Sequence, residues 1–110
     1  MKTLDLVLKE KWYRMIESGE KTEEYREIKP YWIRRLTELK LDFLPFSYRN
    51  GYQTIPFKDY DKVIFHLGYS KDRPSMTFAL DKITINKGKL EWGAEEGKLY
   101  FVIHLGPRLS

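Results

Sequence analysis

Gly19-Glu20-Lys21-Thr22-Glu23-Glu24-Tyr25-Arg26 is an octapeptide between a predicted helix and a predicted strand. Before it, Trp12, Met15 and Ile16 stand at i, i+3 and i+4, which is the spacing of one helical face. A glycine directly after such a face is typical of the left-handed residue that ends a helix. We therefore expect the helix to end at about Ser18, and the chain then to enter a strand with charges where apolar residues are usual.

Side chains of a strand alternate between two faces. The predicted strand places Thr22, Glu24, Arg26 and Ile28 on one face and Glu23, Tyr25 and Glu27 on the other. Ile28 marks the first face as the inward one. Glu24 and Arg26 are then two positions apart, close enough for the guanidinium to bind the carboxylate. Because burying either charge alone costs several kcal/mol, we expect the two residues to pair or to bind a ligand. Lys21, at the corner between helix and strand, can reach the same cavity.

The octapeptide resembles the signature of the ASCH family, Gly-x-Lys-x-x-Glu-x-Arg, and its fixed positions are filled by Gly19, Lys21, Glu24 and Arg26. The resemblance extends over most of the chain. It implies a PUA-like fold of the α+β, mainly β class: a small mixed β-barrel of about five or six strands with two helices near the barrel openings.

The remaining sequence fits the order strand, helix, strand, helix, strands. Leu4, Leu6 and Leu8 alternate with polar residues and predict a first strand, and Pro30 suits the first turn of a second helix. That helix has an apolar stripe of Trp32, Ile33, Leu36 and Leu39. Further strands are expected over residues 62–67, 76–85 and 99–105, with a turn over 68–75, a change of phase at Asp81-Lys82 and a stop at Gly106-Pro107. The nearly continuous apolar run of 62–67 predicts a strand covered on both sides.

Residues 41–61 show no periodicity and are rich in aromatic residues, proline and glycine. Loops of this length in a small domain are usually functional or disordered, and so many rings argue against disorder. Two interpretations stay open. The rings pack over a barrel end, or the loop is a lid whose Tyr48, Arg49 and Tyr52 face a base.

Composition limits the class of protein. The chain has 110 residues, no cysteine, and twenty Lys and Arg against sixteen Asp and Glu, a net charge of +4. This length predicts one domain over residues 1–110. The apolar run that ends at Leu8 is far shorter than a signal peptide or the ~20 residues of a membrane span, so we expect a cytoplasmic protein with no membrane partner. The mild basic excess permits binding to RNA.

Sites for other chemistry have no support in the sequence. His66 and His104 lack a second ligand at metal-binding spacing, so we expect no metal and interpret each as a satisfied strand histidine. Gly-x-Ser-x-Gly and phosphate-binding glycine loops are also missing from the sequence, and we expect no cofactor.

The charged octapeptide allows a structural and a binding interpretation. In the structural one, Glu24 and Arg26 form an ion pair that fills the barrel, and Lys21 is solvated. In the binding one, Lys21 and Arg26 hold a phosphate or a base edge, and Glu24 accepts from an exocyclic amine or a ribose hydroxyl. Further candidate ligand-binding residues are Tyr25 on the strand and Tyr69, Lys71 and Arg73 in the 68–75 turn.

An enzymatic interpretation comes from the resemblance. One bacterial branch of the ASCH family hydrolyses the acyl group from N-acetylated cytidine with the motif lysine, which implies a catalytic role for Lys21. If the chain is an enzyme, Glu24 is the second catalytic candidate, because a carboxylate beside a lysine can help to activate water. That branch has threonine where this chain has Glu24, and the candidates for its distal carboxylate are Asp72 and Glu95. The sequence thus favours a domain that binds RNA or a modified nucleoside or nucleotide, with nucleoside amidohydrolase as the alternative.

Overall fold

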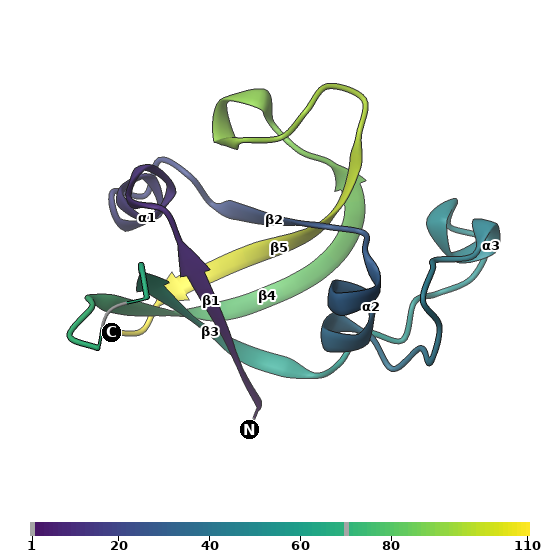
Figure 1. Ribbon diagram of the computed structural model, residues 1–110, viewed down its shortest axis with the longest axis horizontal. Helices are drawn as coiled ribbons and strands as arrows, with labels where there is room; N and C mark the ends of the chain where they lie inside the picture. The colour runs from purple at the N-terminus through teal and green to yellow at the C-terminus, as the bar shows by residue number, and fades with distance from the viewer. Residues whose placement is uncertain (1, 70) are drawn as a thin grey trace. The chain divides into compact units, whose positions relative to one another are not determined.

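The computed structural model describes residues 2–69 and 71–110, so Met1 and Ser70, the latter within the predicted 68–75 turn, lie outside the described residues (Figure 1). The described residues form five strands, three α-helices and one 3-10 turn. In chain order these are β1 (Lys2–Leu8), α1 (Glu10–Glu17), β2 (Glu23–Glu27), α2 (Pro30–Leu36), α3 (Phe46–Arg49), β3 (Tyr60–Leu67), β4 (Ser75–Lys87), the 3-10 turn (Leu90–Trp92) and β5 (Leu99–Arg108).

The strands form one sheet in the order β1-β3-β4-β5-β2. β3 is parallel to β1 and antiparallel to β4, so the sheet is mixed. The predicted α+β class with a mixed sheet of about five strands is confirmed. The short helix α3 was not predicted.

Contacts divide the chain into two compact units. The first consists of Met1–Glu24, Tyr60–Lys82 and Ile103–Ser110, and the second of Tyr25–Asp59 and Ile83–Val102. We call them unit 1 and unit 2. Three strands, β2, β4 and β5, continue from one unit into the other along the chain. The expectation of a single domain over residues 1–110 stays a prediction.

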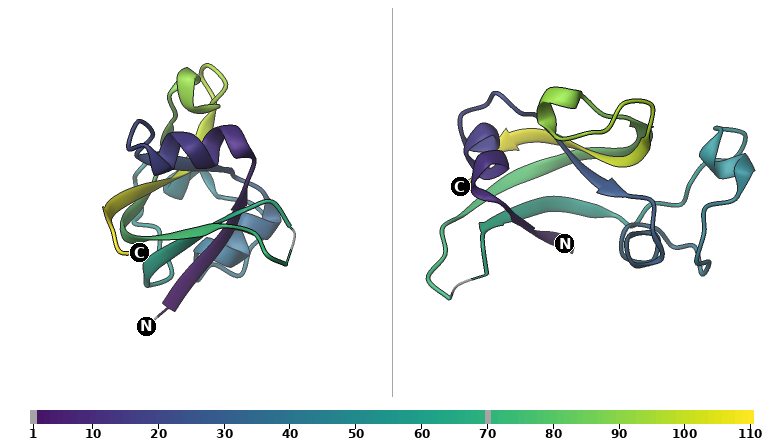
Figure 2. Two further views of the ribbon diagram at one scale, coloured as in Figure 1. Left: turned by 90° about the vertical axis from the view of Figure 1, so that its left-hand side faces the viewer. Right: turned by 45° about the horizontal axis from the view of Figure 1, so that its top comes forward.

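The core of unit 1 comes from alternating apolar residues. Register pairs Leu4 with Val63 and Leu6 with Phe65 across β1 and β3, and Phe65 with Met76 across β3 and β4, so these side chains share one face. All five are buried. α1, which follows β1 directly, contacts β3 (Figure 2). The alternation predicted for the first strand is confirmed.

Two details of unit 1 differ from expectation. The buried residues of α1 are Tyr13 and Ile16, whereas Trp12 is only half-buried, so the buried face is rotated from the predicted one. β3 is fully buried at Val63 and Phe65, but its other face at Ile64 and His66 is only half-buried.

β5 runs past its predicted stop. Pairing continues beyond Gly106 because Leu109 donates to the carbonyl of Thr77 at 2.7 Å, and Thr77 donates to that of Ser110 at 3.0 Å. Gly106 permits a close approach, since a Cβ there would lie 3.2 Å from that of Ala79. Both faces of β5 are covered at its centre, because Tyr100, Phe101, Val102 and Ile103 are all buried.

In unit 2, α2 begins at Pro30 as predicted but ends at Leu36, before Leu39. Thr37 ends it: this buried residue is extended, its hydroxyl donates to the carbonyl of Ile33 at 2.6 Å, and it forms an antiparallel bridge with Phe57. The stripe is therefore shorter than expected, with Ile33 and Leu36 buried.

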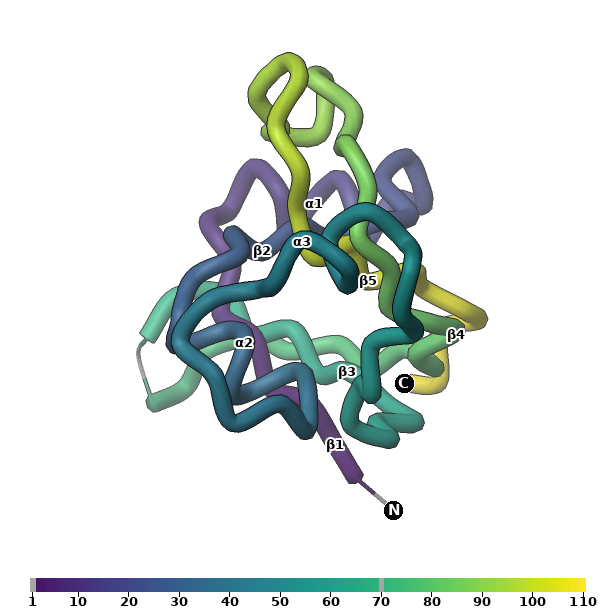
Figure 3. Tube along the Cα trace, turned by 90° about the vertical axis from the view of Figure 1, so that its right-hand side faces the viewer, coloured from purple at the N-terminus to yellow at the C-terminus, as the bar shows by residue number. Residues whose placement is uncertain are grey.

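The connection from α2 to Asp59 leaves its rings in solvent. Figure 3 shows α3 as one turn within this long loop. Phe43, Phe46 and Tyr52 are 63%, 71% and 78% exposed. The interpretation in which these rings pack inward is wrong for all three.

In β4, Asp81 and Lys82 are consecutive exposed residues, which confirms the predicted change of phase there.

Candidate functional site

The octapeptide begins where α1 ends. Gly19 has a φ of +86° and donates to the carbonyl of Ile16 at 3.1 Å, so it is the left-handed residue that the sequence predicted. The backbone N–H of Lys21 then donates to the carbonyl of Met15 at 3.0 Å. This bond turns the chain back along the helix and brings the side chain of Lys21 to the side where Trp12 lies.

Lys21 and Glu24 form a buried ion pair. The ammonium of Lys21 donates to Oε1 of Glu24, and their side chains are 1% and 6% exposed. The ammonium also lies 5.4 Å from the centre of the Trp12 ring, a cation–π distance. Lys21 thus contacts Glu24, and the solvated Lys21 of the structural interpretation is wrong.

Trp12 is the residue of this cluster that was not predicted from the sequence. Its helical spacing predicts a core residue, but it is half-buried, with Lys11 at 4.8 Å and Lys21 at 5.4 Å from its ring centre. The Lys11-Trp12 pair, a cation next to an aromatic residue, was the available signal. The contact of Lys21 with the Trp12 ring could not be predicted, because it depends on the path that the chain takes after Gly19.

Each histidine lies beside a carboxylate. Nε2 of His66 is 2.8 Å from Asp5, and Nδ1 of His104 is 3.5 Å from Glu23. Both histidines are on strands and partnered, as predicted. Among residues 2–69 and 71–110, no three His, Asp or Glu side chains gather in a group that could hold a metal ion.

Arg26 and Tyr25 belong to unit 2 and have partners there. The guanidinium of Arg26 lies 5.2 Å from the ring centre of Trp32 and donates to the carbonyl of Tyr25 at 2.8 Å. The expected contact between Glu24 and Arg26 stays a prediction.

Tyr25 was expected on the outer face of the strand, and this is wrong. Its side chain is buried, and its hydroxyl accepts from the backbone N–H of Lys89 at 3.0 Å. Its ring lies 5.7 Å from that of Tyr100. Tyr25 is therefore a core residue of unit 2 with a satisfied hydroxyl.

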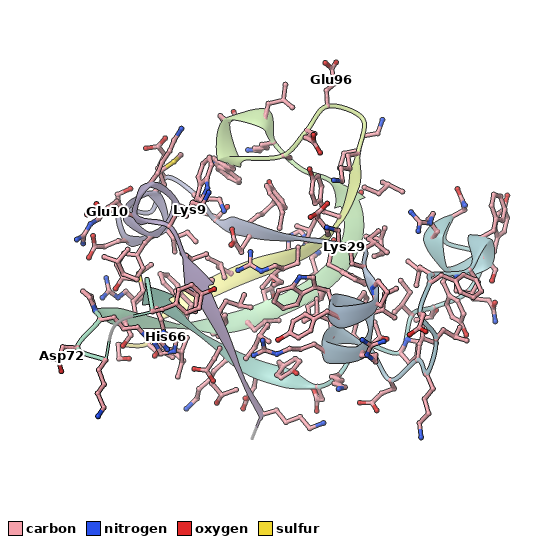
Figure 4. The ribbon with its side chains drawn as sticks, viewed as in Figure 1. Lys9, Glu10, Lys29, His66, Asp72 and Glu96 are labelled. Atoms are coloured by element: carbon pink, nitrogen blue, oxygen red, sulfur yellow. The ribbon has the colours of Figure 1, made fainter. Side chains whose placement is uncertain are left out.

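The candidate residues of the 68–75 turn differ in how far they are exposed to solvent. Tyr69 is 86% exposed and Lys71 is also exposed, whereas Arg73 is half-buried and donates to the carbonyl of Gly68 at 3.0 Å. The Arg73 bond closes the turn. Asp72 lies at the far end of the turn and points away from it (Figure 4). Tyr69, Lys71 and Arg73 as ligand contacts stay a prediction.

Glu95, the other candidate for a distal carboxylate, is exposed in unit 2 and lies 3.0 Å from the ammonium of Lys98. Lys98 also contacts Glu27 at 2.7 Å. The hydrogen bonds from Lys98 and then Lys29 lower the pKa of Glu27 below its ordinary 4.5. Glu95 thus has a surface ion-pair partner of its own.

None of the described helices has the length and apolar character needed to cross a bilayer. Comparisons of the chain with protein-family models, with curated proteins and with solved structures found no match.

Proposed function

We propose that the chain is a PUA-like domain of the ASCH type that binds RNA or a modified nucleoside, with Lys21 and Glu24 as the ligand-contacting residues. The buried Lys21–Glu24 pair carries this proposal. It stands at two of the positions that the family signature fixes, directly after the left-handed Gly19.

The burial of the pair argues for a role beyond stability. Removing two charges from water costs several kcal/mol for each ion, and an apolar pair of similar volume is often as stable or more stable. Buried charges at one place are therefore candidates for function. An ammonium donates and a carboxylate accepts, which together complement the acceptor and amine groups on the edge of a base.

The partly exposed ring of Trp12 supports the same class of ligand. An indole beside a donor and an acceptor can stack on a base while the polar groups bind its edge. The Lys21 ammonium lies 5.4 Å from the centre of the Trp12 ring, so a ligand that stacks on this ring lies beside the ion pair.

The PUA-like barrel is the fold part of the proposal. The order strand, helix, strand, helix, strands and the mixed five-stranded sheet support it. A small barrel built in this way holds its ligand groups on strand ends and on the segments that follow them.

Calorimetric titration with cytidine and N-acetylated cytidine tests the binding. We expect Lys21→Met to weaken the binding of a recognised nucleoside by about 1.5–3 kcal/mol, the value of a charge-assisted hydrogen bond, and Lys21→Arg to retain part of the affinity. Lys29→Met is the matched control, because Lys29 is an exposed lysine paired with Glu27 at 3.0 Å. Equal affinities of wild type and Lys21→Met for every nucleoside bound would contradict the proposal.

A nucleoside amidohydrolase is the second candidate. The observation that favours it is the direct contact between the motif lysine and a carboxylate, because a carboxylate in hydrogen-bond reach of a lysine and a water can act as a general base. Turnover separates this candidate from simple binding.

A further inference from the structure

Two rings of the long connection in unit 2 stack on each other in solvent. The ring centres of Phe46 and Tyr52 are 6.0 Å apart, and the planes are inclined by 20°. The backbone between them is held by Asn50 donating to the carbonyl of Phe46 at 2.9 Å and by Gln53 donating to that of Ser47 at 3.0 Å. The two rings are 71% and 78% exposed and form one contiguous apolar surface, which marks an interaction site more often than single exposed side chains do.

Gly51 and Gln53, the two residues on either side of Tyr52 in the sequence, line a pocket of about 380 Å³. Its apolar wall includes Ile55 and Phe57, and Arg49 and Gln53 are among its polar groups. The volume is in the range of small-ligand sites. The hydroxyl of Ser47 donates to the side-chain oxygen of Gln53.

A second pocket, of about 340 Å³, is lined by the next residue along the chain, because Phe57 lines the first pocket and Lys58 lines the second. Consecutive Cα atoms are only about 3.8 Å apart. Three cations and two carboxylates line this second pocket: Arg34, Lys40, Lys58, Glu38 and Asp42.

The cations are not all neutralised. Arg34 contacts Asp42 at 2.6 Å. Within the part of the chain that the structure describes, the ammonium groups of Lys40 and Lys58 have no side-chain partner. Two such ammonium groups beside a pocket suit a phosphate.

Charge is concentrated in the same part of the chain. Residues 25–59 contain seven Lys and Arg against four Asp and Glu, a net charge of +3 out of the +4 of the whole sequence. A basic surface with exposed rings is the pattern of single-stranded nucleic-acid binding, in which bases stack and phosphates are neutralised. A paired base cannot stack in this way, so double-stranded RNA does not fit.

We propose that the connection between α2 and β3 binds single-stranded RNA. A base stacks on Phe46 and Tyr52, the neighbouring base enters the pocket beside Arg49 and Gln53, and a phosphate binds at Lys40 and Lys58. None of these residues belongs to the Gly19–Arg26 octapeptide. The surface therefore goes beyond the nucleoside site at Lys21, and either can exist without the other.

Fluorescence anisotropy with a labelled oligouridine tests the surface. Phe46→Ala/Tyr52→Ala should weaken binding about 5- to 100-fold, the range of base–aromatic stacking, with little change in salt dependence. Lys40→Glu/Lys58→Glu should weaken binding and lower the slope of log K against log salt by about 0.7 for each phosphate that the variant no longer neutralises. The matched controls are Tyr69→Ala, which removes a ring that is 86% exposed in unit 1, and Lys9→Glu/Lys82→Glu, which makes the same charge change at exposed lysines of unit 1.

The controls should bind as the wild type does. Absent wild-type binding, unchanged affinity in both test variants, or an equal decrease in the controls would overturn the proposal. So would sedimentation showing that the ring variant loses self-association while it keeps its affinity for RNA, because the rings would then bind a second copy of the chain.

The test of the RNA-binding surface and the test of the nucleoside site at Lys21 can succeed or fail independently. If Lys21→Met does not change nucleoside binding but the ring and lysine variants no longer bind RNA, the function proposed for Lys21 fails and this surface stands. If the reverse holds, this surface fails. All substitutions on this surface and in its controls are at exposed or half-buried positions, and an unchanged thermal unfolding curve shows that each variant is folded.

Discussion

Lys21 and Glu24 are an ion pair almost completely removed from water, with side chains 1% and 6% exposed and the Trp12 ring 5.4 Å from the ammonium. They are three positions apart along the chain: Lys21 lies between α1 and β2, two residues after the left-handed Gly19, and Glu24 lies on β2. Such a pair is costly to form and more costly to break on one side.

The first prediction is that the two residues act as a unit in stability. Lys21→Met and Glu24→Gln should each lower the free energy of unfolding by about 3–5 kcal/mol, because each leaves one buried charge without its partner. The double variant Lys21→Met/Glu24→Gln should lose much less than the sum of the two. Urea unfolding of the four proteins measures the coupling.

The matched control is the pair Lys29–Glu27, whose side chains are 62% and 42% exposed and 3.0 Å apart. Its single variants should have far smaller effects, because water screens exposed charges. Additive losses at Lys21 and Glu24 would show that the two do not interact.

The second prediction contrasts two glycines. Gly19→Ala should cost about 1–2 kcal/mol through its left-handed backbone alone, since its φ is +86° and a Cβ there would meet nothing within 4 Å. Gly88→Ala should cost about 1–3 kcal/mol by overpacking, because its Cβ would lie 2.7 Å from that of Ala94 and 2.8 Å from the ring of Tyr25.

Gly19→Asn separates the two causes, because asparagine tolerates the left-handed conformation better than alanine does. Asparagine at position 19 should recover part of the loss, whereas asparagine at position 88 should be worse than alanine. Thermal unfolding measures all four variants, and equal losses for Ala and Asn at position 19 would argue against backbone strain.

Much of the fold could be predicted because it depends on local patterns. The alternation of Leu4, Leu6 and Leu8, the glycine at position 19 and the proline at position 30 each act within a few residues. The early end of α2 and the length of β5 depend instead on distant partners, Phe57 for Thr37 and Thr77 for Leu109. No local pattern contains these partners.

The candidate site shows the same division. The sequence indicated that Lys21 can reach the same cavity as Glu24, since both lie in one octapeptide. The burial of Tyr25 was not, because it depends on Lys89 and Tyr100, both far later in the sequence. The sequence left open whether the rings of the long connection pack inward or face a base, because aromatic residues serve both purposes.

The third prediction concerns pH. Lys98 and Lys29 lower the pKa of Glu27 below its ordinary 4.5, so the unfolded chain holds the proton more tightly than the folded one. The stability that Glu27 contributes is therefore present above its unfolded pKa and is lost as the pH falls through the lower folded pKa. The difference in urea midpoint between wild type and Glu27→Gln should shrink between about pH 5 and about pH 2.

Glu96→Gln is the control, because Glu96 is exposed at the end of its loop and points away from the chain (Figure 4). Its difference from wild type should stay flat over the same range. If the difference in urea midpoint between wild type and Glu27→Gln grew as the pH falls, folding would raise the pKa of Glu27 and the prediction would be wrong.

The last prediction separates binding from catalysis at Lys21. If the site only binds, wild type and Lys21→Met both release no acid from N-acetylated cytidine, and the variant differs in affinity alone. If the site hydrolyses the amide, the wild type releases acetate and cytidine, and Lys21→Met loses that release while it keeps much of its binding. In the resemblance to the ASCH family, Glu24 stands where the hydrolytic branch has threonine, and we therefore expect binding without turnover. Chromatographic detection of cytidine measures the release. Lys29→Met controls for an unrelated lysine, because its ammonium contacts an exposed carboxylate rather than a buried one. Cytidine produced by wild type and by Lys29→Met, but not by Lys21→Met, would make the amidohydrolase the correct function.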